Sequence, residues 1–366
     1  MKNKNTYRFI FGAGGTGGHL FPAVAVAQMI VKLKPEAEIL FVGTTNKIEA
    51  RVIPQLGFAF KSIWISGFSR KFNLNNLLFP IKLIVSLVQS LMINIKFKPK
   101  VAIGAGAYVS GPVLWGANVM GAKIMLLEQN SYPGITNRML EKNAEEIHIS
   151  FEDSKKYFRS NEKLFMSGNP VRTDLVLTDR NKSLAHYNLK TDKKTVLVLG
   201  GSQGALSINN TVAEMCGKLS ENNYQIIWQC GTRYYDDFKK YESDSIKVVP
   251  FIEEMSAAYS AADIVIARAG ATTIAEVSNL GCAVVFVPSK YVAANHQYWN
   301  AKSLEDNSAC ILITDNDLEE KLFSTVSSLM QDEAKQNLLK ENIKKFSKPD
   351  AAKVIAERAI ALAEIK

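Results

Sequence analysis

Residues 9–22, Phe9-Ile-Phe-Gly-Ala-Gly-Gly-Thr-Gly-Gly-His-Leu-Phe-Pro22, place five glycines, a threonine and a histidine between an apolar strand pattern and an apolar helix pattern. Glycines at this density let the backbone turn sharply and approach a ligand closely. The helix expected next, from about Ala23 to Lys32, points its free N–H groups at whatever lies in the turn. The stretch therefore predicts a strand, a glycine-rich turn and a helix that bind an anion, most often a phosphate.

Short β-type runs alternate with helical patterns along the whole chain, which is typical of parallel α/β sheets. Both halves open alike, because residues 7–11 run into Gly12-Ala-Gly-Gly and residues 195–199 into Gly200-Gly-Ser-Gln-Gly204. We therefore expect two similar doubly wound domains that bind ligands beyond the carboxyl ends of their strands. The predicted strands are residues 7–11, 39–42, 101–103, 123–127, 146–149, 195–199, 225–229, 247–249, 264–267 and 283–287.

A length of 366 residues suits two domains rather than one. Glycine and proline interrupt the pattern at Ser167-Gly-Asn-Pro-Val-Arg172, where we expect the boundary. The first domain then covers residues 1–168 and the second residues 169–349. Pro349-Asp350 precedes a last amphipathic helix, and we expect this helix, residues 350–366, to return to the first domain and complete it.

The net charge of +9 is unevenly distributed. Residues 1–110 hold 14 Lys and Arg against three Glu, whereas the remaining 256 residues hold 30 basic and 32 acidic side chains. This asymmetry suggests a polyanionic partner for the first half, a nucleic acid or an anionic membrane, while a merely soluble surface is the alternative. The four cysteines form no Cys-x-x-Cys pair and the N-terminus has no secretion signal, so we expect reduced thiols in a protein that stays inside the cell.

Thirteen residues from Leu83 to Ile95 carry no charge and lie between Lys82 and Lys96. A membrane span needs about 20 residues, so we do not expect this stretch to cross a bilayer. Its apolar residues recur with helical period, which predicts a helix that faces a protein core. The alternative is a surface that enters an anionic leaflet, because apolar and basic side chains are mixed just upstream. The candidate membrane contacts are Arg70, Lys71, Phe72, Leu77, Phe79 and Lys82.

Gly12-Ala-Gly14-Gly-Thr-Gly17 matches the Gly-x-Gly-x-x-Gly fingerprint of dinucleotide-binding proteins, but the pattern alone is weak. A nicotinamide or flavin site also requires an acidic residue at the end of the second strand. That strand runs into Gly43-Thr44-Thr45 and has no carboxylate there. The chain also lacks the Gly-x-x-x-x-Gly-Lys-Ser/Thr motif, so the sequence disfavours both an oxidoreductase and a P-loop nucleotidase.

Three further clusters place the start of a helix at the end of a strand: residues 104–112, 200–205 and 268–276. Tight packing of strand and helix explains any one of them, but four in two domains suggest two phosphate-bearing ligands, one per domain. Among the scarce histidines, His19 lies inside the first glycine turn, where a neutral imidazole can take a proton from a bound hydroxyl or bond to its own backbone. Asp315-Asn-Asp317 resembles a metal-binding pair, but we interpret it as a helix cap.

Seven motifs follow one another along the chain: Gly14-Gly-Thr-Gly-Gly-His-Leu-Phe-Pro22, Glu128-Gln-Asn130, Gly168-Asn-Pro-Val-Arg172, Gly200-Gly-Ser-Gln-Gly-Ala205, Phe251-Ile252, Arg268-Ala-Gly-Ala-Thr-Thr-Ile-Ala-Glu276 and Asn295-His-Gln-Tyr-Trp-Asn-Ala301. Taken together and in this order, they resemble the bacterial peptidoglycan N-acetylglucosaminyltransferases, which turn lipid I into lipid II. The resemblance spans about residues 7–301 and is far more specific than the dinucleotide fingerprint. One departure is Arg268-Ala269-Gly270, where the family has Arg-Ser-Gly, so a hydroxyl contact at this position is in question.

The resemblance implies a GT-B glycosyltransferase with two Rossmann-like parallel-sheet domains facing a cleft, without a cofactor or a required metal. It implies inverting transfer of N-acetylglucosamine from UDP-N-acetylglucosamine to the C4 hydroxyl of N-acetylmuramic acid in lipid I. The second domain would hold the donor, and the first would hold the acceptor. The implied partners are these two substrates and an anionic membrane surface, not a nucleic acid, and the implied location is peripheral, on the cytoplasmic face of the inner membrane.

The resemblance also assigns roles by position. His19 would be the catalytic base. Ser202 would meet the diphosphate, the backbone at Ile252 the uracil, Glu276 the ribose and Gln297 the sugar. The full donor set is Arg172, Ser202, Ile252, Ala271, Thr272, Thr273, Glu276 and Gln297, and the acceptor set is Thr16, Gly17, Gly18 and Asn130.

Two rival functions remain open at this stage. The first is another GT-B transferase that uses a UDP-sugar with a different lipid acceptor, such as a diacylglycerol. The second is a non-catalytic protein that uses the basic first half to bind a membrane surface or a nucleic acid, which predicts a steep salt dependence of nucleic-acid binding and no affinity for UDP.

Overall fold

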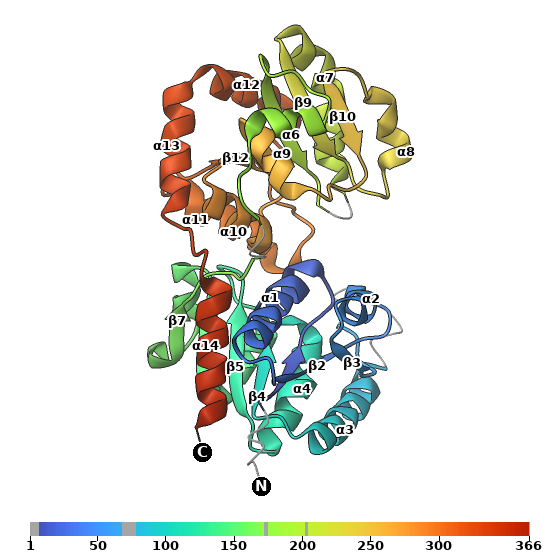
Figure 1. Cartoon of the computed structure of the whole chain (residues 1–366), viewed down its shortest axis with the longest axis vertical. Helices are drawn as coiled ribbons and strands as arrows, with labels where there is room; N and C mark the ends of the chain where they lie inside the picture. Colours follow the sequence, from blue (N-terminus) through green and yellow to red (C-terminus); the bar gives the residue numbers. More distant parts are fainter. Residues whose placement is uncertain (1–6, 68–77, 172–174, 202–203, 366) are drawn as a thin grey trace. The chain divides into compact units, whose positions relative to one another are not determined.

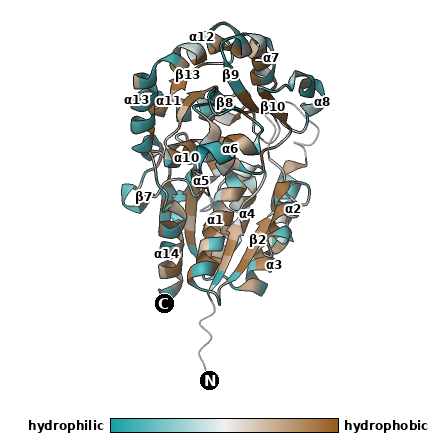
Figure 2. Ribbon diagram, turned by 45° about the horizontal axis from the view of Figure 1, so that its top comes forward, coloured by the Kyte–Doolittle hydropathy of each residue, from teal (hydrophilic) through white to brown (hydrophobic). Residues whose placement is uncertain are grey.

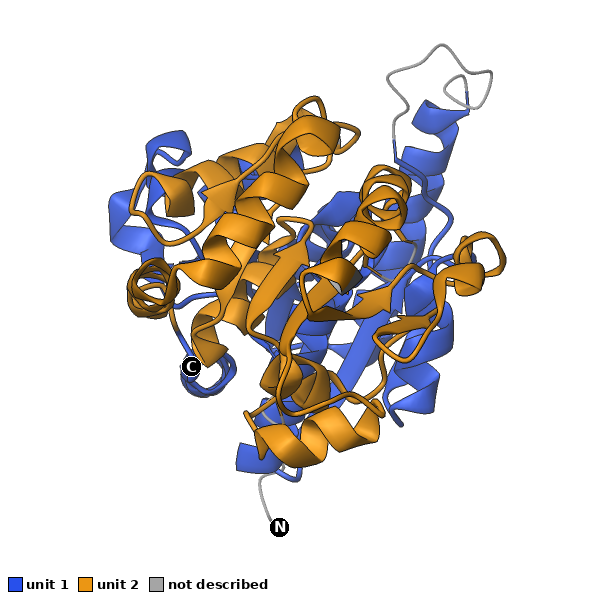
Figure 3. Cartoon of the chain, turned by 90° about the horizontal axis from the view of Figure 1, so that it is seen from above, with its two compact units in different colours: residues 1–172, 348–366 blue, residues 173–347 orange. Residues whose placement is uncertain are grey.

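The computed structural model describes residues 7–67, 78–171, 175–201 and 204–365. The chain divides into two compact units, drawn in blue and orange in Figure 3. The first unit comprises Met1–Arg172 together with Lys348–Lys366, and the second comprises Thr173–Ser347. Each unit is built on its own parallel sheet.

The described part of the first unit contains a seven-stranded parallel sheet in the order β3-β2-β1-β4-β5-β6-β7. The strand order reverses between β1 and β4, and in open α/β sheets ligands bind at such a switch point. The strands are β1 (Arg8–Gly12), β2 (Glu38–Gly43), β3 (Ala59–Ser62), β4 (Val101–Gly104), β5 (Lys123–Glu128), β6 (Glu146–Ile149) and β7 (Leu164–Met166).

Helices cover both faces of this sheet, which explains why its central strands are nearly continuous apolar runs. On one face Phe9 and Phe11 pack with α1 and α14, and on the other Ile10 packs with α4. Strands such as β2 are correspondingly hydrophobic in Figure 2. The helices are α1 (Gly17–Leu33), α2 (Ile48–Gln55), α3 (Phe79–Phe97), α4 (Ala107–Val119), α5 (Ile135–Leu140) and α14 (Ala351–Glu364), with 3-10 turns at Glu141–Asn143, Glu152–Tyr157 and Asn161–Lys163.

Helix α14 belongs to the first unit although it ends the chain. It lies beside α1 (Figure 1), and its Ile355, Ala356 and Ala359 are fully buried in the core next to β4 and β5. The last turn of α14 contacts the residue that precedes β1, because the hydroxyl of Tyr7 donates a 2.6 Å hydrogen bond to Glu364.

The second unit contains a six-stranded parallel sheet, in its described part, with the order β10-β9-β8-β11-β12-β13. Here the strand order reverses between β8 and β11, which makes the turns after these two strands the expected ligand site. The strands are β8 (Lys194–Leu199), β9 (Tyr224–Gln229), β10 (Ile246–Val249), β11 (Ile264–Ala267), β12 (Ala283–Phe286) and β13 (Ile311–Leu312). The helices are α6 (Arg180–His186), α7 (Leu206–Glu221), α8 (Tyr235–Phe238), α9 (Met255–Ala261), α10 (Ala271–Leu280), α11 (His296–Glu305), α12 (Leu318–Gln331) and α13 (Glu333–Lys344), with 3-10 turns at Lys239–Tyr241 and Ala293–Asn295.

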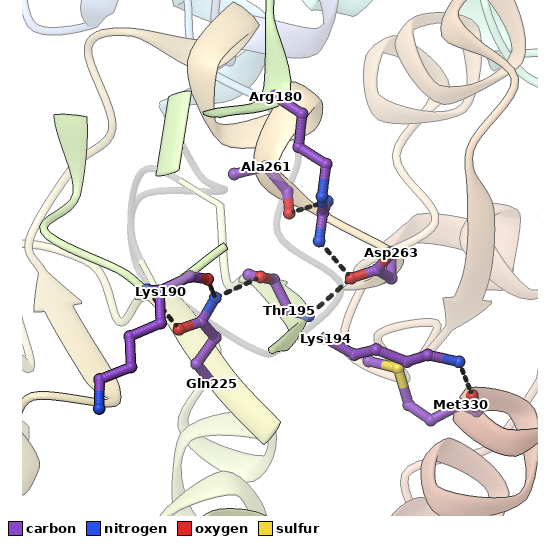
Figure 4. A network of polar contacts seen from close by, with 8 residues as sticks. All are labelled: Arg180, Lys190, Lys194, Thr195, Gln225, Ala261, Asp263 and Met330. Atoms are coloured by element: carbon purple, nitrogen blue, oxygen red, sulfur yellow. Dashed lines mark hydrogen bonds and ion pairs between the residues drawn. The ribbon is translucent and has the colours of Figure 1, made fainter. Parts of the chain in front are cut away.

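A polar network joins the amino ends of the second unit's strands, at the edge of the sheet opposite the expected site (Figure 4). Asp263 accepts hydrogen bonds from the Thr195 amide at 2.7 Å and from Arg180 at 2.8 Å. Gln225 bonds both backbone groups of Lys190 and the hydroxyl of Thr195. These contacts hold α6 against β8 and β9 and leave the carboxyl edge of the sheet for ligands.

All ten predicted strands are present, and the two doubly wound units confirm the predicted fold class. The sequence missed β3, β7 and β13, which are short edge strands with few buried side chains. The first helix was predicted too late: it begins at Gly17 rather than at Ala23, and it contains Pro22. Gly17, Gly18 and His19 therefore form its first turn rather than a loop.

Helix α3 contradicts the prediction of a core-facing helix. Its buried residues are Ser86, Ser90 and Asn94, which lie four residues apart on one face and pack on α4. The opposite face is apolar and exposed, with Ile84 63% and Met92 64% accessible. Among the described helices, α3 is the one long and apolar enough to span a membrane by length and composition alone. The helical period was correct, but the face assigned to the core was wrong.

Candidate functional site

The turns after β1, β4 and β5 meet at the switch point of the first unit and converge on His19. The imidazole Nδ1 lies 3.0 Å from the carbonyl oxygen of Ala105, after β4, and 3.1 Å from Oε1 of Gln129, after β5. Burial of the ring lowers the pKa of His19 below its ordinary value of 6.5, against the opposing effect of these two hydrogen bonds. The ring is therefore a neutral imidazole at neutral pH, which is the form that can accept a proton.

A carboxylate of the protein itself occupies part of the first glycine turn. Glu49, on α2, is fully buried and accepts hydrogen bonds from the amide of Gly15 at 3.0 Å and from the amide and hydroxyl of Thr44 at 3.0 and 2.8 Å. A Cβ on Gly14 would lie 2.5 Å from this carboxyl group, so the glycine there makes room for Glu49. Because the Gly15 amide already donates to Glu49, a bound anion would have to accept hydrogen bonds from the amides that follow Gly15.

Those following amides are Gly17 and Gly18, the first two residues of α1. Their N-cap residue, Thr16, is exposed and its side chain makes no capping hydrogen bond within the described part of the chain. The positive end of the helix dipole and the unused N–H groups therefore face outward at Thr16, Gly17 and Gly18. These are three of the four residues that the resemblance assigned to the acceptor.

The turn after β4 shapes the site with an unusual backbone. Gly106 has φ of +86° and Ala107 has φ of 62°, a left-handed conformation that costs a non-glycine residue energy. A Cβ on Gly106 would lie 3.0 Å from Nδ1 of His19, so only glycine lets the ring reach the Ala105 carbonyl. Ser110 then ties this turn to β1 through a 2.6 Å hydrogen bond to the carbonyl of Gly12.

The turn after β5 is organised by the buried carboxylate of Glu128. It accepts hydrogen bonds from the amides of Asn130 and Gly134, both at 3.0 Å, and from the side chain of Asn137 at 2.8 Å. Burial raises the pKa of Glu128, and these donors oppose that rise. Asn130, the fourth acceptor-side residue, lies half-buried in the turn that Glu128 holds.

In the second unit, α10 begins at the switch point beside β8 and carries four of the predicted donor residues: Ala271, Thr272, Thr273 and Glu276. Its N-cap, Gly270, supplies no side chain to the first turn. The hydroxyl of Thr272 is buried and has no hydrogen-bond partner among the described residues. One turn later, Glu276 accepts a 3.0 Å hydrogen bond from the buried hydroxyl of Tyr259, which fixes the position of its carboxylate.

Two other predicted donor residues make contacts within the protein. The amide of Ile252 donates a 2.9 Å hydrogen bond to Oε1 of Gln229, so its carbonyl is the backbone group left for a ligand. Gln297, in the first turn of α11, accepts a 2.9 Å hydrogen bond from the amide of Ser289 and thereby holds the loop after β12.

Arg268 fastens the turn after β11 to its neighbours. Its guanidinium donates to the carbonyl of Val287 at 2.9 Å, to Asp315 at 2.8 Å and to the hydroxyl of Ser207 at 2.8 Å. The prediction that Asp315 caps a helix is therefore wrong, because its carboxylate pairs with Arg268. Asp317 is the N-cap residue of α12, but its carboxylate bonds the side chains of Thr314 and Lys321.

Several predicted site residues lie outside the described residues: Arg172, Ser202, Arg70, Lys71, Phe72 and Leu77. Of the predicted membrane contacts, Phe79 opens α3 and Lys82 follows one turn later. The ammonium group of Lys82 lies 3.2 Å from the hydroxyl of Ser66 and 5.8 Å from the ring of Trp64, which is 48% exposed.

Comparison with known proteins identifies the class of this site. Residues 9–149 match the glycosyltransferase family 28 N-terminal domain, and residues 195–355 match the family 28 C-terminal domain. The chain belongs to glycosyltransferase family 28. These two segments include the turns after β1, β4, β5, β8 and β11, so the switch points described above are those of a glycosyltransferase.

Two relatives and one crystal structure show which enzymes of family 28 this chain resembles. The chain is 42% identical to a UDP-N-acetylglucosamine--N-acetylmuramyl-(pentapeptide) pyrophosphoryl-undecaprenol N-acetylglucosamine transferase of Flavobacterium psychrophilum, over 98% of both chains. It is 44% identical to the transferase of the same name from Christiangramia forsetii, over 97% of both. The crystal structure of Acinetobacter baumannii MurG matches with a TM-score of 0.78 and 26% identity, over 97% of this chain and 99% of that one.

The resemblance expected from the motifs is thus confirmed, as are the GT-B fold and the enzyme class. A glycosyltransferase of kitacinnamycin shares the fold alone, with a TM-score of 0.70 and 15% identity. Sequence reasoning nevertheless missed residues that organise this family 28 site: Glu49, Ala105, Gln129 and Tyr259. Gln129 stood inside the Glu128-Gln-Asn130 motif and Ala105 inside the cluster of residues 104–112, so both could have been singled out, whereas Glu49 and Tyr259 have no local signal.

Proposed function

We propose that this family 28 glycosyltransferase transfers N-acetylglucosamine from UDP-N-acetylglucosamine to the C4 hydroxyl of N-acetylmuramic acid in lipid I, with inversion, to give lipid II. The observation that carries the proposal is 42–44% identity, over nearly the full length, to transferases named for these substrates. A diacylglycerol acceptor is less favoured, because the relatives' names specify a pyrophosphoryl-undecaprenol acceptor.

The second unit is the proposed donor site. Attack at the anomeric carbon moves negative charge onto the leaving UDP, and the start of α10 offers unused amides and the Thr272 hydroxyl to stabilise that charge. Glu276, held by Tyr259, is the proposed ligand of the ribose hydroxyls. Ala271, Thr273, the Ile252 backbone and Gln297 complete the proposed donor contacts, with Arg172 and Ser202 assigned from the motifs alone.

The first unit is the proposed acceptor site, and His19 is the proposed base. The amides at Thr16, Gly17 and Gly18 suit the acceptor's pyrophosphate, since Glu49 leaves them unoccupied. Neutral His19, whose pKa is lowered by burial, would remove the proton from the attacking C4 hydroxyl. Asn130 is proposed to contact the acceptor from the turn after β5.

The same unit carries the proposed membrane surface, on the cytoplasmic face of the inner membrane. Helix α3 turns its serines and asparagine inward and exposes Ile81, Ile84, Val88, Met92 and Ile95. An exposed apolar stripe on a domain with an excess of basic residues suits the interface of an anionic leaflet. A peripheral contact of this kind would bring the enzyme to an acceptor that is anchored by its lipid tail.

The test is transfer of radiolabelled N-acetylglucosamine from UDP to lipid I, with diacylglycerol as the competing acceptor. The expected result is labelled lipid II and no labelled glycosyl-diacylglycerol. Transfer to diacylglycerol alone would overturn the choice of acceptor, and calorimetry that detected no UDP binding would overturn the donor. His19→Ala should lower turnover by roughly 10² or more, whereas the matched control His186→Ala, at an exposed position of α6, should leave it unchanged.

A further inference from the structure

The Nδ1 atom of His19 faces two oxygen atoms, and both can only accept a hydrogen bond. They are the Ala105 carbonyl at 3.0 Å and Gln129 Oε1 at 3.1 Å. The amide of Gln129 is oriented by its other end, because Nε2 donates to the carbonyl of Leu127 at 3.3 Å. With its side chain buried, Gln129 presents oxygen rather than nitrogen to the ring.

We propose that Gln129 is a positioning residue that, together with the Ala105 carbonyl, holds the His19 ring with its proton on Nδ1 and leaves Nε2 as the nitrogen that takes a proton. The proposal rests on the proposed role of His19 as the base. It adds the residue that selects the tautomer and the direction in which the basic nitrogen points. A ring with the other tautomer would place two acceptors against a lone pair and would lose both hydrogen bonds.

The backbone around Gln129 and Ala105 is built for this contact. Gly106 adopts a φ of +86°, and a Cβ there would press on Nδ1 at 3.0 Å. Three turns, after β1, β4 and β5, must therefore keep their mutual positions for one imidazole to make both bonds. The strand register that pairs β1 with β4 and β4 with β5 supplies that rigidity.

An amide at position 129 also suits a base that works near neutral pH. The influences on the pKa of His19 are burial, which lowers it, and the hydrogen bonds of Gln129 and Ala105, which raise it less. A carboxylate in place of the amide would favour the charged ring and raise its pKa by about 1 to 3 units. Gln129 thus orients the ring without protonating it.

The second buried histidine of the same unit provides an internal reference. His148 Nε2 lies 3.1 Å from the carboxylate of Glu146, and its Nδ1 lies 2.7 Å from the hydroxyl of Ser167. Because a carboxylate only accepts while a hydroxyl can donate, His148 carries its proton on Nε2. The two histidines are therefore expected to be opposite tautomers in one protein.

The direct test is long-range ¹H–¹⁵N NMR of the full chain labelled with ¹⁵N-histidine, at a pH where both rings are neutral. The expected spectrum shows a protonated Nδ1 in His19 and a protonated Nε2 in His148, with His19→Gln used for assignment. A protonated Nε2 in His19, or a mixture of its tautomers, would overturn the proposal. This measurement needs no altered position 129 and no catalytic activity.

The kinetic test is Gln129→Glu, read as the pH profile of kcat/KM for transfer to lipid I. The acidic limb should move up by about one pH unit or more, with recovery at higher pH. The matched control is Gln225→Glu, which buries a carboxylate in the second unit and should leave the limb in place. A folded Gln129→Glu enzyme whose acidic limb is not shifted would refute the positioning role of Gln129 and leave the role of His19 standing. Near-normal turnover of His19→Ala would instead refute the role of His19 as the base.

Discussion

The guanidinium of Arg358 donates two hydrogen bonds, of 2.7 and 2.6 Å, to the carboxylate of Glu146, 212 positions earlier in the chain. The same guanidinium lies 3.6 Å from the centre of the Phe165 ring. Burial alone would raise the pKa of Glu146, but the bonds from His148 and Arg358 lower it overall. This cluster joins the last helix of the chain to β6 and β7.

Arg358→Ala is expected to destabilise the first unit by about 2 kcal/mol, because it leaves a mostly buried carboxylate with the His148 hydrogen bond but without the two from the guanidinium. The expected loss is smaller than for a fully buried pair because the Arg358 side chain is 38% exposed. Urea unfolding measures it. Lys353→Ala, which removes a positive charge from an exposed position of the same helix, should change the stability by less than about 0.5 kcal/mol. Equal effects of the two variants would contradict the prediction.

The pH dependence of transfer should reflect His19. Burial lowers its pKa below the ordinary 6.5, so the proton-accepting form predominates above that pH and is lost as the pH falls through the lowered value. We expect kcat/KM to be flat from about pH 7 upward and to decline on the acidic side. Steady-state rates measured across this range test the prediction, and an acidic limb lying above pH 7 would contradict it.

Tyr259→Phe should weaken UDP-N-acetylglucosamine binding about fivefold, because it removes one hydrogen bond, worth about 1 kcal/mol, from Glu276. Glu276→Ala should weaken binding more, and neither change should alter the KM for the acceptor. Calorimetry with UDP measures the affinity. Tyr241→Phe makes the same chemical change elsewhere in the second unit and serves as the control. Unchanged donor affinity of Glu276→Ala would exclude the ribose role.

Charges placed on the exposed face of α3 should release the enzyme from membranes. Ile84→Glu combined with Met92→Glu adds two negative charges to this face and should abolish sedimentation with vesicles rich in anionic lipid. Activity on a short-chain, water-soluble acceptor should persist, because neither residue contacts the His19 site. Leu338→Glu alters an apolar residue on α13 that is 51% exposed and should leave vesicle binding intact. Retained binding of the double variant would reject the surface.

Most of the architecture could be predicted from the sequence because parallel strands are continuous apolar runs with glycine turns at their ends. The edge strand β3 could not, since Ala59–Ser62 is mostly exposed and lacks that pattern. The start of α1 was misplaced because glycines and Pro22 have low helix propensity. The helix nevertheless begins with Gly17 and Gly18 and contains Pro22 in its second turn.

Site residues could be predicted where they lie within one sequence motif. Contacts between residues of separate turns could not be predicted. Thr16, Gly17, Gly18 and His19 follow from a single stretch. The contact of His19 with Gln129 spans 110 positions and depends on β4 lying between β1 and β5. Periodicity also cannot tell which side of a helix faces the protein, which is why α3 was assigned the wrong face.

The position of α14 has a consequence for biosynthesis. Ile355, Ala356 and Ala359 cover apolar strands made at the start of translation, yet the 175 residues of the second unit (173–347) leave the ribosome before them. The nascent amino-terminal sheet therefore lacks α14, which shares one face of the sheet with α1, while the later unit has all its parts and can fold first. Emergence of α14, rather than emergence of residue 172, completes the amino-terminal unit.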